Sequence, residues 1–221
     1  MSAYFFSFPL DAKLQQTLDD LLTNHAKGQY ADASVPVALA VGTTDGVIKA
    51  LALDVIDILK TNGEGAGILG MLANLLKSTM HTLIKQIMGK VSPAEQDKLA
   101  AYLSRRRVMV NGTARFGFSM PDAVGSRFES VLKRIAAGDM ANSREDLTTA
   151  MNEFVNLSTA CFYDEFTGAL ELGFVKQKMV NLGRSAILKG SQSAVAKLFV
   201  SMSDDDLKRV CAHYDSMFVK A

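Results

Sequence analysis

The strongest candidates for binding chemistry in this sequence are four closely spaced arginines, Arg105, Arg106, Arg107 and Arg115. A guanidinium group presents a planar set of N–H donors that matches the oxygens of phosphate, sulfate and carboxylate. The first three arginines close a predicted helix, and the fourth follows shortly afterwards. The sequence therefore predicts an anion-binding site at these residues if their side chains converge.

Residues suited to acid–base or metal chemistry are scattered along the chain. The adjacent Asp164 and Glu165 fit a general acid–base pair, and also fit the solvated face of a helix. The acidic run 204–206 fits a metal site, or the start of a helix whose dipole favours carboxylates. We predict no metal site and no cofactor, and the sequence assigns no catalytic residue. The three histidines lie in separate predicted helices, without a second metal ligand at the usual spacing: His25, His81 and His213.

Two short motifs match nucleotide- or RNA-binding patterns only in part. The stretch 65–70 has the spacing of a G-x-G-x-x-G dinucleotide loop. It follows a helical pattern instead of a strand, and it lacks the acid about 20 residues later, so we interpret it as a turn between helices. The stretch 115–118 (Arg-Phe-Gly-Phe) lacks the glycine and the further aromatic of an RNA-recognition strand. We therefore assign its phenylalanines to the core and do not expect nucleic acid as a partner.

Charge is distributed unevenly, although the formal net charge is only +1. Residues 1–64 hold four Lys/Arg and eight Asp/Glu, which gives −4. Residues 65–134 hold eleven and four, which gives +7, and residues 135–221 hold nine and eleven, which gives −2. The basic middle segment predicts an anionic partner. The alternative is that its charges pair with the acidic ends of the same chain.

Residues 65–90 form the clearest amphipathic helix and contain no acid. At about 100° per residue, one narrow arc carries the basic side chains and apolar side chains cover about half of the circumference. A basic face beside a broad apolar face is typical of a helix at a membrane surface. A bundle helix buried on two sides has the same pattern. The residues predicted to contact a membrane or a partner are Leu72, Leu76, Lys77, His81, Leu83, Lys85 and Ile87.

The elements that must position these residues are mostly helices. Apolar residues recur at helical spacing in six or more runs, and Ser92 and Ser203 are predicted N-caps. Asn-Gly at 111–112 predicts a short β-hairpin near 108–118. The apolar spacing over 143–189 predicts one long helix, unless Gly168, Gly173 or Gly183 breaks it, and this helix offers a seam for a homo-oligomer. We expect an all-α, or nearly all-α, bundle-like single domain over residues 1–221.

Composition excludes several broad classes of protein. A chain with 48% hydrophobic and 21% charged residues is not disordered, and two cysteines exclude a disulfide-dense scaffold. We find neither a signal-peptide pattern nor a charge-free apolar run long enough to span a membrane. We therefore expect a cytoplasmic protein with reduced cysteines.

Together these patterns favour a non-enzymatic helical binding protein that uses residues 65–134 against an anionic surface, either a protein or a lipid surface. One alternative is a membrane-active protein that inserts the helix over 65–90. A second alternative is a small helical enzyme or ligand carrier with an arginine-lined anion pocket.

Overall fold

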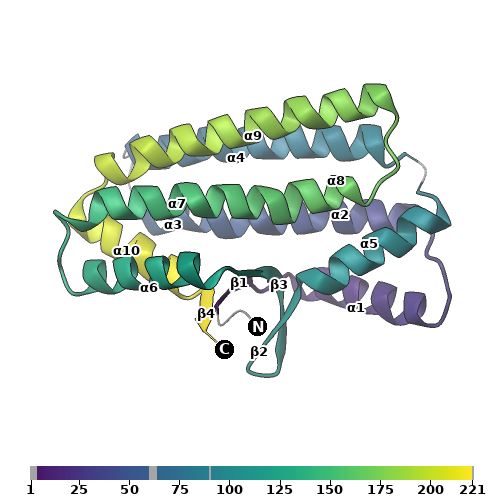
Figure 1. Ribbon diagram of the computed structural model, residues 1–221, viewed down its shortest axis with the longest axis horizontal. Helices are drawn as coiled ribbons and strands as arrows, with labels where there is room; N and C mark the ends of the chain where they lie inside the picture. Colours follow the sequence, from purple (N-terminus) through teal and green to yellow (C-terminus); the bar gives the residue numbers. More distant parts are fainter. Residues whose placement is uncertain (1–3, 60–63, 90, 221) are drawn as a thin grey trace.

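Helices dominate the structure and pack in three layers (Figure 1). The computed structural model describes residues 4–59, 64–89 and 91–220. The upper layer in Figure 1 is the pair α4 (Glu64–Ile87) and α9 (Phe174–Ser201). The middle layer holds α2 (Ser34–Ile48), α3 (Asp54–Leu59), α7 (Ser143–Thr159) and α8 (Glu165–Gly168). The lower layer holds a small sheet with α1 (Ala12–Ala26), α5 (Pro93–Arg106), α6 (Asp122–Ala136) and α10 (Asp204–Asp215).

Two helices start at the N-caps that the sequence predicts. Ser92 caps α5 in a capping box with Glu95, and Ser203 accepts a hydrogen bond from the Asp206 amide at the start of α10. Gly138 follows α6 with a φ of 95°, which is a conformation that suits glycine. The predicted mostly helical, bundle-like fold is confirmed.

Two helices of the middle layer contain a π-helical turn. Lys49–Leu53 (η1) joins α2 to α3, and Ala160–Asp164 (η2) joins α7 to α8. A π-turn holds an extra residue and rotates the side chains that follow it, and such turns often lie at functional sites. Both of the long middle-layer helices therefore change the face that they present to the interior.

The predicted hairpin is confirmed and belongs to a larger sheet. β2 (Arg107–Val110) and β3 (Thr113–Met120) are joined by Asn111 and Gly112, whose φ values of 50° and 78° suit a tight hairpin turn. Two strands from the ends of the described chain complete an antiparallel sheet of order β2-β3-β1-β4. They are β1 (Tyr4–Phe8) and β4 (Phe218–Lys220).

Phenylalanines join this sheet to the helices. The ring of Phe6 on β1 contacts those of Phe118, Phe154 and Phe218, and the closest pair is Phe6–Phe154 at 4.7 Å between centroids. Phe116 and Phe118 of the partial RNA-binding motif are both 1% exposed. Their assignment to the core is therefore confirmed.

The predicted continuous helix over 143–189 is wrong. The chain leaves α8 after Gly168, turns over 169–173 and runs back as α9 to Ser201 (Figure 1). Both arms bury an apolar stripe in the same bundle, so the periodicity continues across the turn. The break lies between Gly168 and Gly173, two of the three glycines that the sequence left open as breaks. Within the chain, α7 packs against α6 and α9, and the homo-oligomer through this segment stays a prediction.

The predicted glycine turn at 65–70 is also wrong. Gly65, Gly67 and Gly70 lie inside α4, while Gly63 falls outside the described residues. Packing overrides the low helix propensity of glycine here, because Gly65 is buried close to the side chains of Leu59 and Leu198. The last described element before this stretch is the helix α3, not the strand that a dinucleotide loop follows.

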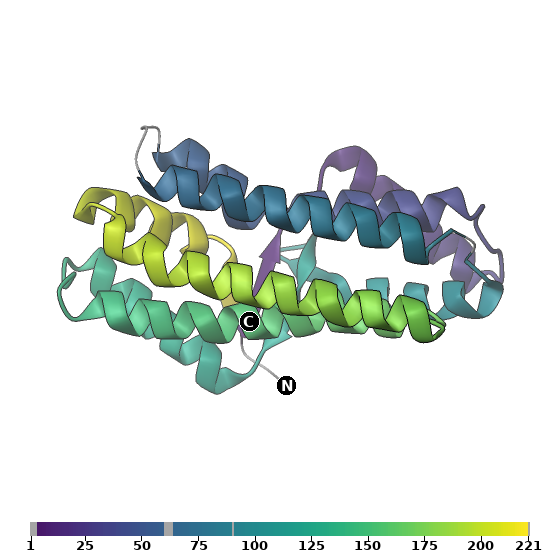
Figure 2. The same cartoon turned by 90° about the horizontal axis from the view of Figure 1, so that it is seen from above.

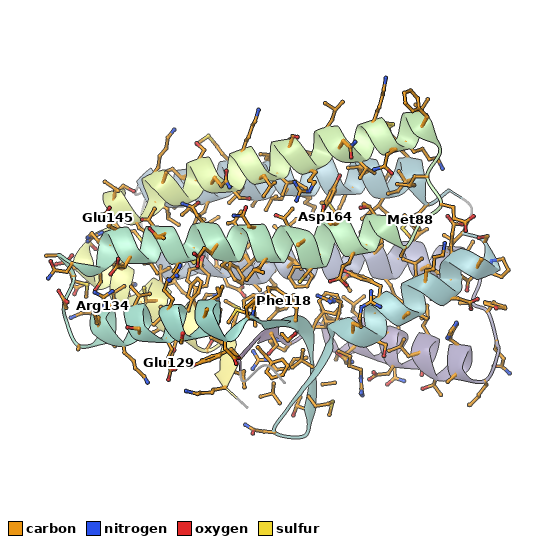
Figure 3. The ribbon with its side chains drawn as sticks, in the orientation of Figure 1. Met88, Phe118, Glu129, Arg134, Glu145 and Asp164 are labelled. Atoms are coloured by element: carbon orange, nitrogen blue, oxygen red, sulfur yellow. The ribbon has the colours of Figure 1, made fainter. Side chains whose placement is uncertain are left out.

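The carboxylate of Glu129 on α6 connects this helix to the strands β1 and β4 (Figure 3). Tyr4 Oη donates to Glu129 Oε2 at 2.7 Å, and the ammonium groups of Lys133 and Lys220 lie 2.6 and 3.2 Å from its oxygens. These hydrogen bonds, with that of Lys133 the largest contribution, lower the pKa of Glu129 to about 2. The charged carboxylate therefore helps to hold β1 and β4 against α6.

Glu129→Gln is expected to remove a pH-dependent part of the stability. A carboxyl whose pKa is lowered by folding stabilises the fold above its unfolded pKa, and this contribution disappears as the pH falls from about 4.5 to about 2. Urea unfolding at several pH values should show the wild type more stable than the variant at pH 6. A difference between them that stays constant down to pH 2 would contradict this role.

Candidate functional site

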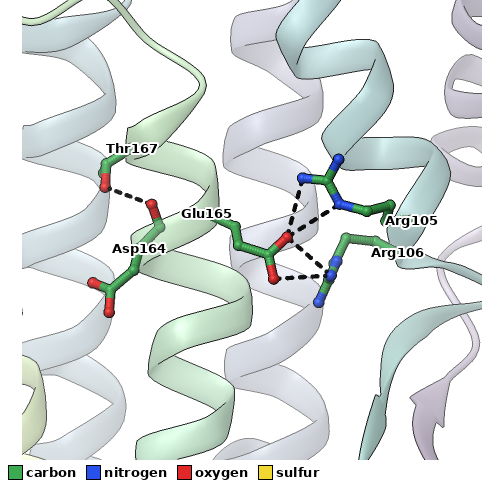
Figure 4. Close-up of polar contacts among 5 residues, drawn as sticks. All are labelled: Arg105, Arg106, Asp164, Glu165 and Thr167. Carbon is green, nitrogen blue, oxygen red and sulfur yellow. Dashed lines mark hydrogen bonds and ion pairs between the residues drawn. The ribbon is translucent and has the colours of Figure 1, made fainter. Parts of the chain in front are cut away.

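The predicted arginine site is occupied by carboxylates of the same chain (Figure 4). Arg105 Nη2 and Arg106 Nη2 each lie 3.1 Å from Glu165 Oε2. Arg107 Nε lies 3.0 Å from Asp19 Oδ1, and Arg115 donates to the carbonyl of Ser7 at 2.7 Å. The structure therefore brings two of the four arginines together and directs the other two to separate partners.

Arg106 is the most enclosed of these side chains. It is only 6% exposed, and its guanidinium lies 5.7 Å from the centre of the Tyr102 ring. Its Nη2 shares Glu165 with Arg105, while Nε and Nη1 are buried and have no hydrogen-bond acceptor among the described residues. A buried positive charge is costly in free energy unless it is paired, so Arg106 depends on the carboxylate of Glu165 for its stabilisation.

The proposed acid–base pair does not act as a unit. Glu165 faces the arginines of α5, whereas Asp164 binds Arg184 Nε at 2.8 Å and accepts through its backbone carbonyl from Thr167 (Figure 4). The thiols offer no nucleophile, because burial raises the pKa of Cys161 and raises that of Cys211 to about 12. The two carboxylates thus serve separate ion pairs.

Metal ligands do not gather anywhere in the described ranges 4–59, 64–89 and 91–220, which hold no group of three His, Cys, Asp or Glu able to bind an ion. His25 and His81 each contact one carboxylate, Asp97 at 2.8 Å and Asp45 at 2.9 Å. His213 contacts the backbone carbonyl of Ala50 at 2.9 Å.

Internal ion pairs account for most of the charge of the basic segment 65–134. Besides the arginines of α5, the basic side chains of this segment reach acids in both flanking segments and within α6. This is the pairing with the chain's own acidic ends that the charge pattern left open as an alternative. The further pairs are Lys77 and His81 with Asp45, Lys98 with Glu171, Arg127 with Glu153, Lys133 with Glu129, and Arg134 with Asp146.

The apolar residues predicted to contact a membrane or partner face inward. Leu83 and Ile87 are buried, and Leu72 and Leu76 line an internal cavity. Lys77 and His81 point to Asp45 on α2, and Lys85 is exposed. In this structure α4 is therefore a bundle helix with its apolar face in the core.

We call this space, which is partly open to the surface, the central cavity. It has a volume of about 130 Å³ and lies between α2, α4, α7 and α9, with both π-turns contributing to its wall. Its lining contains no charged side chain. The hydroxyls of Tyr163 and Tyr214 in the wall donate to backbone carbonyls, those of Val180 and Leu51. The cavity can therefore hold an apolar molecule but offers no group for acid–base chemistry.

A smaller cavity of about 40 Å³ adjoins the central cavity. Thr44, Val47 and Phe162 line both spaces, so the ring of Phe162 on η2 stands in the wall between them. The outer side of the smaller cavity is polar and includes His25 and Gln96.

The arrangement defines a helical bundle with an apolar interior site, and comparisons with known proteins add nothing further. No family model, curated protein or solved structure matches this chain.

Sequence reasoning found the arginines but missed the central cavity. A cavity is the space left between side chains of several helices, so no local pattern reports its presence. The available signal was indirect: small residues such as Ala52, Ser191 and Ala194 interrupt the apolar stripes that face it.

Proposed function

We propose that this protein is a non-enzymatic binding protein that holds a small apolar ligand in the central cavity. The observation that carries the proposal is a cavity of about 130 Å³ with an uncharged wall. An apolar cavity of about 150 Å³ stays free of water and accepts a molecule such as benzene, a comparison drawn from an engineered lysozyme. The ligand class is therefore a single aromatic ring or a short branched alkyl group.

The two π-turns support this assignment independently. Leu51 and Ala52 of η1 and Phe162 and Tyr163 of η2 all line the central cavity. A π-turn is less favourable than a regular helical turn and is retained most often where it shapes a site. Two such turns, from different helices, meet at the same cavity.

The alternative with an anionic partner for segment 65–134 has weaker support. Its arginines are engaged by Glu165 and Asp19, and most of its other basic side chains also have acidic partners. Buried guanidinium nitrogens without a partner in the described part of the chain favour an anion there, namely Nε and Nη1 of Arg106 and Nε of Arg115 and Arg134. Phosphate that raises the melting temperature beyond matched ionic strength would support this second function.

Binding of toluene to the full-length protein tests the cavity proposal. Six to seven buried carbons give about 5 kcal/mol, or a Kd of about 0.2 mM. At about 1 mM ligand, this stabilises the native state by about 1 kcal/mol and raises the melting temperature by about 3 °C. Ala194→Leu should abolish this rise, because the larger side chain fills the cavity next to Leu198.

The matched control is Ala196→Leu, two residues away on the exposed side of α9. It adds the same side chain outside the cavity and should retain the full ligand effect. No rise in the wild type, or an equal rise in both variants, would exclude the central cavity as the binding site.

A further inference from the structure

The side of the α4–α9 pair that faces away from the bundle combines lysines with exposed apolar side chains. We call it the outer face. Figure 2 shows α4 and α9 side by side along the whole length of the molecule. In Figure 3, long side chains with nitrogen ends project from α9 away from the other layers. The residues that define the outer face are Met71, Lys85, Val175, Lys178, Leu182, Lys189, Lys197 and Val200.

The charge of the outer face has one sign. Neither α4 from Gly65 onward nor α9 contains an acidic residue. The other basic residues of α9 are used internally, since Arg184 binds Asp164 and Lys176 donates to the Ile87 carbonyl. Within the described chain, no ion-pair partner lies at the lysines of the outer face, namely Lys85, Lys178, Lys189 and Lys197.

Apolar side chains on the same face are unusually exposed. Met71 is 69% exposed, Leu182 72% and Val200 74%. On α9, Lys178, Leu182, Lys189 and Val200 fall within an arc of about 60° at about 100° per residue. A groove between the two helices, lined by Met71 and Lys197 among others, makes the face continuous. The pattern is that of an amphipathic surface for lipid headgroups.

We propose that the outer face docks on an anionic lipid membrane while the bundle stays folded. A second copy of this chain docked on the outer face would place lysines next to lysines, and the face has no acidic residue to offset their repulsion. A protein partner fits less well, because lysine is depleted in protein interfaces and these aliphatic side chains are dispersed. The buried apolar side chains of α4, such as Leu83 and Ile87, would reach lipid only after unfolding, whereas Leu72 lines both the groove of the outer face and the central cavity.

A single tryptophan reports docking, because the sequence contains none. Leu182→Trp places it on the outer face, and Met109→Trp places the control on β2, at the far side of the molecule (Figure 1). With vesicles of phosphatidylcholine and phosphatidylglycerol, the fluorescence of the first variant should shift to the blue and that of the second should not. Phosphatidylcholine vesicles alone should shift neither, and added salt should weaken the effect.

Charge reversal provides the matched comparison in vesicle sedimentation with the full chain. Lys178→Glu with Lys189→Glu and Lys197→Glu should weaken binding more than about 100-fold, since each lysine contributes about fivefold near an anionic surface. The control reverses three exposed lysines elsewhere, so its net charge changes by the same amount as that of the first variant. It should bind vesicles within about threefold of the wild type. Its positions are Lys13, Lys27 and Lys208.

Equal weakening of vesicle binding in both triple variants would overturn the proposal. A wild-type protein that does not bind anionic vesicles would also overturn it. Loss of the helical circular dichroism signal on binding would also overturn it, because insertion of the inner face of α4 requires the bundle to open. Toluene should raise the melting temperature of the Lys178→Glu triple variant as much as that of the wild type. Failure of the membrane proposal can therefore be distinguished from failure of the cavity proposal.

Discussion

Replacing Glu165 by alanine is expected to lower the free energy of unfolding by about 3 kcal/mol, because it leaves the charge of Arg106 buried without a partner. Arg106 is 6% exposed, and Glu165 supplies the only acceptors for its Nη2 in the described residues. The carboxylate is 36% exposed, so we place the loss at the low end for a buried pair. Urea unfolding monitored by circular dichroism measures it.

The matched control for this prediction is Glu171→Ala. Glu171 pairs with Lys98 at 3.1 Å, and both side chains are at least half exposed. An exposed pair of this kind contributes less than about 1 kcal/mol, so the control should be nearly as stable as wild type. Similar losses in the two variants would show that burial of Arg106 does not govern the effect.

Replacing Gly117 by alanine is expected to destabilise the protein by more than about 4 kcal/mol. A Cβ at this position of β3 would lie 1.9 Å from the carbonyl oxygen of Phe6 and 2.7 Å from Ser7 Cα. These are backbone atoms of the paired strand β1, so they cannot move aside without separating the strands. Thermal unfolding should show either a greatly lowered melting temperature or no folded protein.

Gly67→Ala is the control for this second prediction. Gly67 lies on the exposed side of α4, and nothing is within 4 Å of an added Cβ. Alanine in a helix is favoured over glycine by up to about 1 kcal/mol, so this variant should be slightly more stable than wild type. A mild effect of Gly117→Ala, comparable to that of the control, would contradict the close approach of β1 and β3.

Features set by neighbouring residues were predictable from the sequence. The capping box at Ser92, the N-cap at Ser203 and the turn at Asn111 depend on a few adjacent residues, and all three appear as predicted. Strand β1 was missed because its partners lie more than a hundred residues away, and a five-residue apolar run does not distinguish a strand from a buried helix.

In the candidate site, too, only the features that depend on neighbouring residues were predictable. The arginines at 105–107 stand out by residue type, but their partners Glu165 and Asp19 come from α8 and α1, which only the fold brings near. The reversal at 169–173 decides which faces of α7 and α9 meet, and thereby creates the central cavity. The charge pattern pointed to residues 65–134, whereas most of the unpaired lysines of the outer face lie on α9, and finding them required the pairing of α4 with α9.

The central place of β1 in the sheet has a consequence for synthesis on the ribosome. β1 is made first, but it pairs with β3 at residues 113–120 and with β4 at residues 218–220. At about 5–20 residues per second, Phe6 and Phe8 wait roughly 5–20 s for β3 to emerge. During that interval these aromatic side chains have no strand to pair with, so we expect a chaperone to hold this segment of the nascent chain. The sheet is completed only after β4, which follows β3 in the chain, has also emerged.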